Sequence, residues 1–305
     1  MPDIDMSVTL AGMTMKNPIV VASGTFGFGR EYSEFYDISA LGGICVKGLT
    51  PQRREGNPPP RIAETPMGML NSVGLQNPGV DAFIARELPE LKKHDLRIIA
   101  NISGNTPEEY GVMCEKLSAA GVDMIEVNIS CPNVKAGGLA YGTRPDLAAE
   151  VTAEAKKHST VPVMVKLSPN VTDVTEIARA VEGAGADAIS LINTIRGMRI
   201  DLNTRRPILK MNTGGLSGPA VFPVAVRMVW EVANAVKVPI LGMGGVSTGK
   251  DAAEMMLAGA AAVAIGAACF DQPFAPVWAC NSLKEIGEAQ GLTKISELTG
   301  AVKPW

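Results

Sequence analysis

The sequence has no long hydrophobic run, no excess of positive charge and no evident export signal. None of its apolar stretches approaches the ~20 residues that a membrane-spanning helix needs. Residues 1–6 lack the basic-then-apolar layout of a signal peptide and do not form a basic amphipathic helix. With 28 Lys and Arg against 31 Asp and Glu, the net charge of −3 gives no electrostatic footprint for nucleic acid. We therefore expect a cytoplasmic protein with neither a membrane nor a nucleic-acid partner.

Cysteine is scarce, and its spacing is not that of a metal or disulfide site. The five cysteines form an odd set without a Cys-x-x-Cys pair: Cys45, Cys114, Cys131, Cys269 and Cys280. This argues against a disulfide framework and against a zinc or iron–sulfur site within the chain. A reducing compartment fits this pattern, and any iron–sulfur chemistry would have to be carried by a different polypeptide.

What the sequence does contain is a regular alternation of short apolar runs with helix-like segments. Hydrophobic residues make up 46% of the 305 residues, so a sizeable core is expected, either in one large barrel or in two modest domains. Most runs are apolar at nearly every position, as in parallel strands that are buried on both faces. The predicted strands are Ile19–Gly24, Gly43–Gly48, Arg97–Ser103, Met124–Ser130, Val163–Ser168, Ala188–Thr194, Ile240–Gly245 and Ala262–Gly266.

The segments between these runs have helical spacing. They are Val80–Lys93, Pro107–Ala119, Pro145–His158, Val174–Glu182, Ala220–Ala235, Lys250–Leu257 and Val277–Gln290. Eight strands alternating with helices predict an α/β fold, a closed (β/α)8 or TIM barrel. Recurring Ala-Gly pairs at 120–121, 184–185 and 258–259 support it, because glycine at a helix end lets the chain turn into the next strand. No linker divides the chain, so residues 1–305 are predicted to form a single domain.

Three segments fall outside this repeat. Val8–Leu10 and Met15–Ile19 flank residues 11–14 and predict an N-terminal β-hairpin that caps the barrel. Thr50–Pro78 and Arg196–Gly218 are long and irregular, and loops of that length in a compact domain are usually functional. We expect these long loops to cover the C-terminal face of the barrel, where active sites of such barrels lie.

Polar residues stand at the carboxyl ends of most predicted strands. Any one of them could be an ordinary turn former, but their convergence on one rim predicts a binding site. Asparagine offers both a donor and an acceptor, which suits a planar, amide-bearing ligand such as a flavin or a pyrimidine. The residues are Ser23, Lys47, Asn101, Asn128, Lys166, Asn193 and Thr194.

The last two strands end instead in glycine, at Gly244-Gly245 and at Gly266-Ala267. Barrels commonly hold a phosphate with bare backbone N–H groups at this position. The turn 214–218 adds a third glycine-rich segment, which leads into a helix. Together these turns predict a phosphorylated cofactor. There is no Gly-x-Gly-x-x-Gly after an early strand and no Walker lysine, which disfavours Rossmann and P-loop chemistry.

A general base is hard to find among the usual residue types. The two histidines, His94 and His158, stand beside lysines at polar helix ends and are expected at the surface. Carboxylates lie mostly on predicted helices, with none at a strand tip. Cys131, just past the fourth strand and followed by proline, remains as the candidate base, since a thiol has an unperturbed pKa of ~8.5. The other four cysteines are assigned to packing.

At these residues the sequence resembles a known family. Segment 128–135, Asn-Ile-Ser-Cys-Pro-Asn-Val-Lys, followed by two glycines, closely resembles the active-site loop of class 1 dihydroorotate dehydrogenases. So do segment 71–79, Asn193-Thr194 and Gly244-Gly245, and the likeness runs from the N-terminal hairpin to about Phe270. Residues 135–138 resemble subclass 1B rather than the fumarate-using subclass 1A. The membrane-attached class 2 enzymes, which use a serine base, fit less well.

The resemblance implies a set of ligand contacts. Those to FMN are Ser23, Lys47, Gly48, Asn101, Asn128, Lys166, Ile192, Gly218, Gly244, Gly245, Gly266 and Ala267. Those to the substrate are Lys47, Asn71, Ser72, Val73, Gly74, Leu75, Asn128, Asn133, Asn193 and Thr194. In one departure, Ala267 stands where many relatives have threonine, which would lose one hydroxyl contact.

The resemblance also implies a reaction, the oxidation of (S)-dihydroorotate to orotate in pyrimidine biosynthesis. Lys47 and Asn71 would hold the substrate carboxylate, Cys131 would remove the C5 proton, and C6 would deliver hydride to N5 of FMN. Lys166, near N1 and O2, would stabilise the charge that reduction creates. A partner subunit with FAD and a 2Fe–2S cluster would pass the electrons to NAD+, in a heterotetramer around a homodimer of this chain.

Three alternatives remain open at this point. One is the fumarate-using 1A reaction or a reduction like that of dihydropyrimidine dehydrogenase. Another is a flavin-free barrel for a sugar phosphate, in which Lys47 and Lys166 would be candidates for Schiff-base formation. The third, a binding protein without activity, fits poorly with so many polar groups on one rim.

Overall fold

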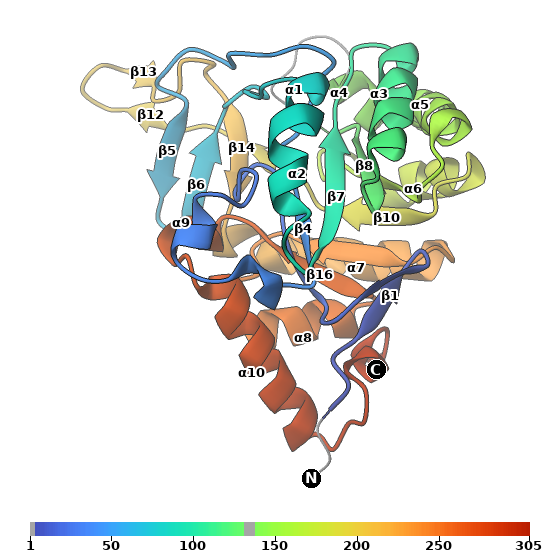
Figure 1. Cartoon of the computed structure of the whole chain (residues 1–305). Coiled ribbons are helices and arrows are strands. Elements are labelled where there is room, and N and C mark those ends of the chain that lie inside the picture. The colour runs from blue at the N-terminus through green and yellow to red at the C-terminus, as the bar shows by residue number, and fades with distance from the viewer. Residues whose placement is uncertain (1–3, 131–137) are drawn as a thin grey trace.

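The computed structural model describes residues 4–130 and 138–305. Eight parallel strands close into a barrel in chain order, as predicted (Figure 1). They are β3 (Ile19–Val21), β4 (Gly43–Cys45), β7 (Arg97–Ile102), β8 (Met124–Asn128), β9 (Val163–Lys166), β10 (Ala188–Leu191), β15 (Ile240–Met243) and β16 (Ala262–Ile265). Each strand begins at the predicted residue and ends one to three residues early. The residues beyond these ends are the polar and glycine-rich tips.

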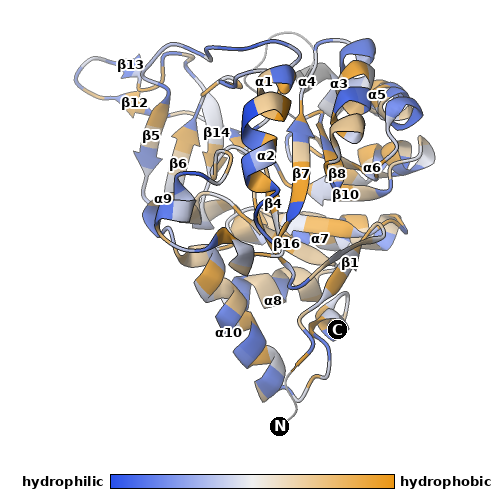
Figure 2. Ribbon diagram, viewed as in Figure 1, coloured by the Kyte–Doolittle hydropathy of each residue, from blue (hydrophilic) through white to orange (hydrophobic). Residues whose placement is uncertain are grey.

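Helices surround the barrel between successive strands. The α-helices are α1 (Val80–Ala82), α2 (Leu88–Leu91), α3 (Pro107–Ala120), α4 (Gly138–Thr143), α5 (Pro145–His158), α6 (Val174–Gly183), α7 (Phe222–Ala235), α8 (Gly249–Leu257), α9 (Ala268–Asp271) and α10 (Ala275–Ala289). A π-helical turn, Phe83–Glu87, joins α1 to α2, and 3-10 turns cover Tyr32–Glu34, Ile38–Ala40, Pro219–Val221 and Ile295–Leu298. Apolar residues concentrate on the barrel strands, whereas polar residues lie on the outer helices (Figure 2). None of the described helices is long and apolar enough to cross a membrane.

The N-terminal hairpin is present, but its predicted second strand is wrong. β1 (Val8–Leu10) pairs with β2 (Met13–Met15), and Ile19 belongs to the barrel. Ala11 and Gly12 have positive φ of 49° and 80°, so a tight two-residue turn places Leu10 opposite Met13. The side chain of Asn17 then accepts a hydrogen bond from the N–H of Ile19 at 3.1 Å, which directs the chain into the first barrel strand.

The two long segments that were predicted to be irregular, Thr50–Pro78 and Arg196–Gly218, contain strands, so that prediction is corrected. We call these segments the first and the second excursion. The first contains β5 (Ile62–Thr65) and β6 (Gly68–Asn71), and the second contains β11 (Ile195–Gly197), β12 (Ile200–Asp201), β13 (Arg206–Pro207) and β14 (Gly214–Ser217). β14 pairs antiparallel with β6, so the two excursions build one sheet of order β11-β14-β6-β5. In Figure 1 this sheet stands beside the carboxyl ends of the barrel strands, with the β12–β13 ribbon at its far end. The register sets Gly215 opposite Asn71.

Candidate active site

A cavity at the carboxyl ends of the barrel strands brings most predicted site residues together. Its open space, which includes solvent at the mouth, is about 1200 Å³. It is lined by all of the predicted FMN contacts: Ser23, Lys47, Gly48, Asn101, Asn128, Lys166, Ile192, Gly218, Gly244, Gly245, Gly266 and Ala267. Of the predicted substrate contacts it is lined by Lys47, Asn71, Val73, Gly74, Leu75, Asn128, Asn193 and Thr194.

Three predicted site residues do not appear in this lining. Cys131 and Asn133 lie outside the described residues. Ser72 is fully buried behind the cavity, and its hydroxyl has no hydrogen-bond partner among the described residues. Its backbone ties it to the first excursion, with its N–H donating to the carbonyl of Arg61 at 2.8 Å. Successive side chains of an extended segment point to opposite faces, so Asn71 and Ser72 face opposite ways.

The loop between Asn71 and Leu75 is held by a side chain that the sequence analysis did not single out. The amide oxygen of Asn77 accepts hydrogen bonds from the N–H of Thr50 at 3.1 Å and of Gly79 at 2.9 Å. Its amide nitrogen donates to the carbonyl of Leu75 at 2.7 Å. Asn77 is buried, and Leu75 has a positive φ of 58°. These bonds hold a strained turn in place, so the loop reaches the cavity in one conformation.

One end of the cavity is made of bare backbone. Gly244 and Gly245 have φ of 122° and 77°, which side-chain-bearing residues rarely adopt. A Cβ on Gly245 would lie 2.8 Å from both the carbonyl oxygen of Gly218 and the backbone nitrogen of Phe222. Glycine is therefore required for these segments to approach one another. Such a surface presents peptide groups to a ligand and suits a phosphate.

Gly266 is glycine for a different reason. A Cβ there would come no closer than 3.5 Å to the side chain of Ala22 and 3.7 Å to that of Thr25. Both of these neighbours line the cavity, so the Cβ would occupy the cavity rather than clash with the fold. Gly266 thus keeps space free for a ligand.

The opposite end of the cavity is made of side chains from β7, β8 and β9. Lys47 and Lys166 are the only charged side chains among the described residues that line the cavity. Both are cations, so the cavity favours anionic ligands. Gly48 allows the amide of Asn101 to approach, since a Cβ on Gly48 would lie 2.7 Å from its oxygen.

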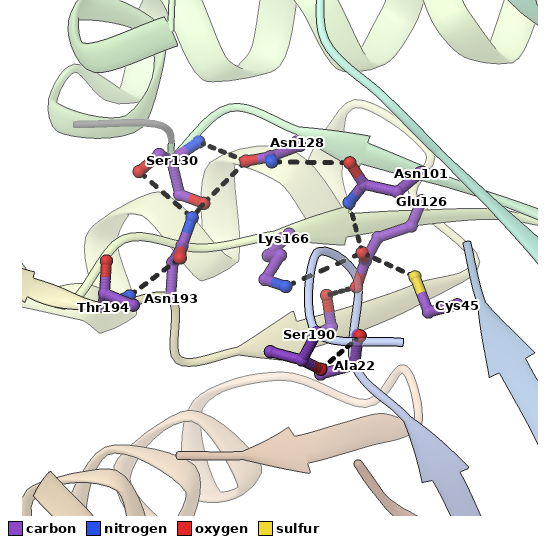
Figure 3. A network of polar contacts seen from close by, with 11 residues as sticks. Ala22, Cys45, Asn101, Glu126, Asn128, Ser130, Lys166, Ser190, Asn193 and Thr194 are labelled. Atoms are coloured by element: carbon purple, nitrogen blue, oxygen red, sulfur yellow. Dashed lines mark hydrogen bonds and ion pairs between the residues drawn. The ribbon is translucent and has the colours of Figure 1, made fainter. Parts of the chain in front are cut away.

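A fully buried carboxylate, Glu126 in β8, lies beneath these side chains (Figure 3). One of its oxygens accepts hydrogen bonds from the amide of Asn101 at 2.5 Å and the thiol of Cys45 at 3.0 Å. The Lys166 ammonium lies 3.8 Å from the same oxygen. The other oxygen accepts from the hydroxyl of Ser190 at 2.6 Å. The sequence analysis missed this residue, although a glutamate inside an apolar strand is itself a signal that a buried partner is present.

The protonation state of this group follows from its partners. Burial favours the neutral acid, but the Lys166 ammonium and the three hydrogen bonds outweigh it and hold the pKa of Glu126 below its usual value of 4.5. The pKa of Cys45 is raised well above 9.0, mainly by burial and by the Glu126 charge. Cys45 is therefore a neutral thiol that donates a hydrogen bond to an ionised carboxylate. This role is more specific than the predicted packing.

A chain of hydrogen bonds leads from this carboxylate across the cavity floor (Figure 3). The amide of Asn128 donates to the oxygen of Asn101 at 3.5 Å. The oxygen of Asn128 accepts from the backbone N–H of Ser130 at 3.1 Å and from its hydroxyl at 2.8 Å. The amide of Asn193 donates to the Ser130 hydroxyl oxygen at 2.7 Å, and its own oxygen accepts from the N–H of Thr194 at 2.8 Å.

The remaining candidates for acid–base chemistry do not line the cavity. His94 pairs with Asp37 at 3.6 Å, and His158 pairs with Glu154 at 3.0 Å, both partly exposed. Cys114 and Cys269 are buried. Burial raises the pKa of each of these two thiols to about 12, which makes neither a usable base.

A closed parallel barrel with a glycine-lined cradle at one side of its carboxyl rim and cationic and amide side chains at the other is the arrangement of a cofactor-binding barrel enzyme. The family model described as "Dihydroorotate dehydrogenase" matches residues 5–286. The chain therefore belongs to the dihydroorotate dehydrogenase family.

Close relatives carry a more specific name, "Dihydroorotate dehydrogenase B (NAD(+)), catalytic subunit". The relative from Thermoanaerobacter pseudethanolicus is 52% identical over 98% of this chain and 99% of its own length. The one from Geobacillus kaustophilus is 55% identical over 97% of this chain and 95% of its own. A Bacillus cereus relative is 54% identical over 97% of this chain and 96% of its own.

Proposed function

We propose that this chain is the catalytic subunit of a class 1B dihydroorotate dehydrogenase and oxidises (S)-dihydroorotate to orotate with FMN. The observation that carries the proposal is one cavity with two unlike ends, a glycine cradle and a floor of amides and lysines. The two ends suit the phosphate and the flat, amide-bearing ring of FMN, and the space beside Asn71 and Asn193 suits a small pyrimidine acid. The names of the relatives support the same assignment.

FMN fits the cavity by residue type. Gly218, Gly244, Gly245, Gly266 and Ala267 would hold its phosphate, and Asn101, Asn128 and Lys166 would meet its ring. The space kept at Gly266 and the cationic floor are both consistent with an anionic cofactor. When bound, FMN supplies the hydride acceptor at its N5.

The substrate would be fixed by the residues above the floor. Lys47 and Asn71 would bind its carboxylate, with backbone N–H groups of the Asn71–Leu75 loop, while Asn128, Asn133, Asn193 and Thr194 would bind the amide edges of the ring. Cys131 would remove the C5 proton. Its neighbour in the sequence, Ser130, is hydrogen-bonded to Asn128 and Asn193, both of which line the cavity.

A second polypeptide would complete the electron path. The relatives are named catalytic subunits of NAD(+) enzymes, which supports a partner for this chain as well. We propose that the partner carries FAD and a 2Fe–2S cluster and that two copies of each chain form the complex.

The test is a comparison of electron acceptors. The purified chain should be yellow and should oxidise dihydroorotate with a dye acceptor, and NAD+ should serve only after the partner is added. Rapid turnover with fumarate by the isolated chain would instead assign it to the 1A reaction. A colourless chain that cannot be loaded with FMN would remove the proposal.

A further inference from the structure

Glu126 lies beneath the cavity floor, and the proposed reaction gives it no role. It is fully buried, it does not line the cavity, and its carboxylate nevertheless contacts Lys166 and Asn101, which do. A buried carboxylate is costly, and an apolar residue at this position of β8 would pack at no such cost. The presence of a carboxylate here therefore points to a function in the site.

We propose that Glu126 is a positioning residue, which sets the direction of the hydrogen-bond chain across the cavity floor and holds the Lys166 ammonium beneath the cofactor. The inference rests on the proposed function for its catalytic consequence. Its structural basis is independent of that function, because it depends only on the contacts among described residues.

The direction of these hydrogen bonds follows from the chemistry of Glu126, where they begin. An ionised carboxylate can only accept hydrogen bonds, so the NH2 group of Asn101 must face Glu126 and its oxygen must face Asn128. The NH2 group of Asn128 is thereby committed as a donor, and its oxygen accepts from Ser130. The Ser130 hydroxyl donates its hydrogen bond to Asn128 and accepts one from the amide of Asn193. Every donor in the chain thus points back toward Glu126.

This order determines what the floor offers to ligands. Each amide orientation is fixed by the bond before it, so the donors and acceptors that face the cavity cannot flip independently. These hydrogen bonds pass through Ser130, which directly precedes the proposed base Cys131 in the sequence. A carboxylate at one end of the floor therefore positions groups at the other.

The charge of Glu126 acts on Lys166 in a second way. The side chain of Lys166 is only 5% exposed, and a buried ammonium without a counter-charge is strongly disfavoured. Glu126 supplies this counter-charge, and the orientation of Lys166 toward it fixes the nitrogen at the floor. Loss of the carboxylate would remove both the counter-charge and the anchor.

The test uses Glu126→Gln, which keeps the size of the side chain, with Ser190→Ala as the matched control. Ser190→Ala removes one bond to the same carboxylate but keeps the charge, the pair with Lys166 and the chain through Asn101. Glu126→Gln should weaken FMN binding about tenfold or more, as expected for loss of a charged hydrogen-bonded contact. It should also shift the flavin midpoint potential and slow flavin reduction at saturating dihydroorotate, whereas Ser190→Ala should change each of these properties less.

A purely structural role predicts a different pattern, in which both variants lower the melting temperature and neither moves the potential. That result would overturn the proposal, as would a Glu126→Gln protein with unchanged FMN affinity and reduction rate. If Glu126→Gln does not fold, Glu126→Asp tests the proposal in its place. This variant keeps the negative charge, but its shorter side chain moves the carboxylate away from Asn101. Unchanged FMN affinity in Glu126→Asp would equally overturn the proposal. The FMN titration keeps its meaning even if the unaltered protein fails to oxidise dihydroorotate, so the two proposals can fail separately.

Discussion

The two ends of the cavity recognise ligands by different means. At β7, β8 and β9 the floor consists of side chains, with Asn101, Asn128 and Lys166 linked through Glu126. At β15 and β16 the glycine end consists of backbone, and Gly245 and Gly266 allow a ligand to approach it closely. The side-chain end offers charge and directed hydrogen-bonding groups, whereas the backbone end offers only peptide dipoles and shape.

This difference separates chemistry from attachment within one barrel. A reaction that moves a proton and a hydride needs groups whose protonation matters, and these come from the side-chain end. A phosphate needs many weak donors and no proton transfer, and the glycine end suits it. Substitutions at the two ends should therefore fail in different ways.

Cys131→Ala should have the largest effect, because it removes the proposed base. Flavin reduction by dihydroorotate should slow by about 10²–10⁴-fold, while FMN stays bound. Stopped-flow absorbance at the flavin band measures the rate. Cys280→Ala, in the partly buried outer helix α10, is the control and should react like the unaltered protein. An unimpaired rate in Cys131→Ala would remove that residue from the mechanism.

At the backbone end, Gly245→Ala and Gly266→Ala should differ from one another. A Cβ at Gly245 meets Gly218 and Phe222 at 2.8 Å with φ at 77°, so the apoprotein should lose on the order of 1–2 kcal/mol of stability as well as FMN affinity. A Cβ at Gly266 meets no atom closer than 3.5 Å, so its apoprotein should melt normally and bind FMN more weakly. Calorimetry and quenching of flavin fluorescence measure the two effects. Unchanged FMN affinity in Gly266→Ala would show that the phosphate does not occupy this space.

The side-chain end should respond to acid. The folded state holds the pKa of Glu126 below its usual 4.5, so its contribution to stability is fully present above about pH 4.5 and is lost as the pH falls through the lowered pKa. In Glu126→Gln this contribution is absent at every pH. The melting temperature of the unaltered apoprotein should therefore fall more steeply with acid than that of Glu126→Gln. Parallel pH profiles would contradict an ionised Glu126.

The smallest effect is expected at Ala267, which stands where threonine is common among the enzymes that this sequence resembles. Ala267 lines the glycine end of the cavity. Ala267→Thr should add one hydroxyl contact to the cofactor, worth about 0.5–1.5 kcal/mol, and so tighten FMN binding severalfold without altering the reduction rate. Weaker binding in this variant would show that the threonine side chain clashes with the cofactor and does not form a hydrogen bond to it.

The barrel could be predicted because each of its strands is a short apolar run, and burial on both faces leaves that pattern in the sequence. The tips could be predicted because polar residues and glycines end those runs. The sheet over the cavity could not, since β6 and β14 come from excursions far apart in the sequence and pair only in the folded chain. Strand-like alternation is weak in both, and proline and glycine are frequent there.

Glu126 was missed for a related reason. Polar residues at strand ends mark the rim of a barrel, whereas this carboxylate lies within β8 and contacts Asn101 and Lys166. Its signal was local, a charge within the run Met124–Asn128, but its partners come from four other strands or their ends. A sequence shows that a buried charge needs a partner and does not show which residues provide it.

The central claim is that one cavity holds FMN at its glycine end and dihydroorotate above its amide floor, close enough for hydride transfer. An anaerobic titration of the FMN-loaded chain with (S)-dihydroorotate, followed by absorbance, tests this claim most directly. The account predicts that the flavin band bleaches as substrate is added and that orotate is formed in equal amount. A flavin band that persists with excess dihydroorotate would contradict it.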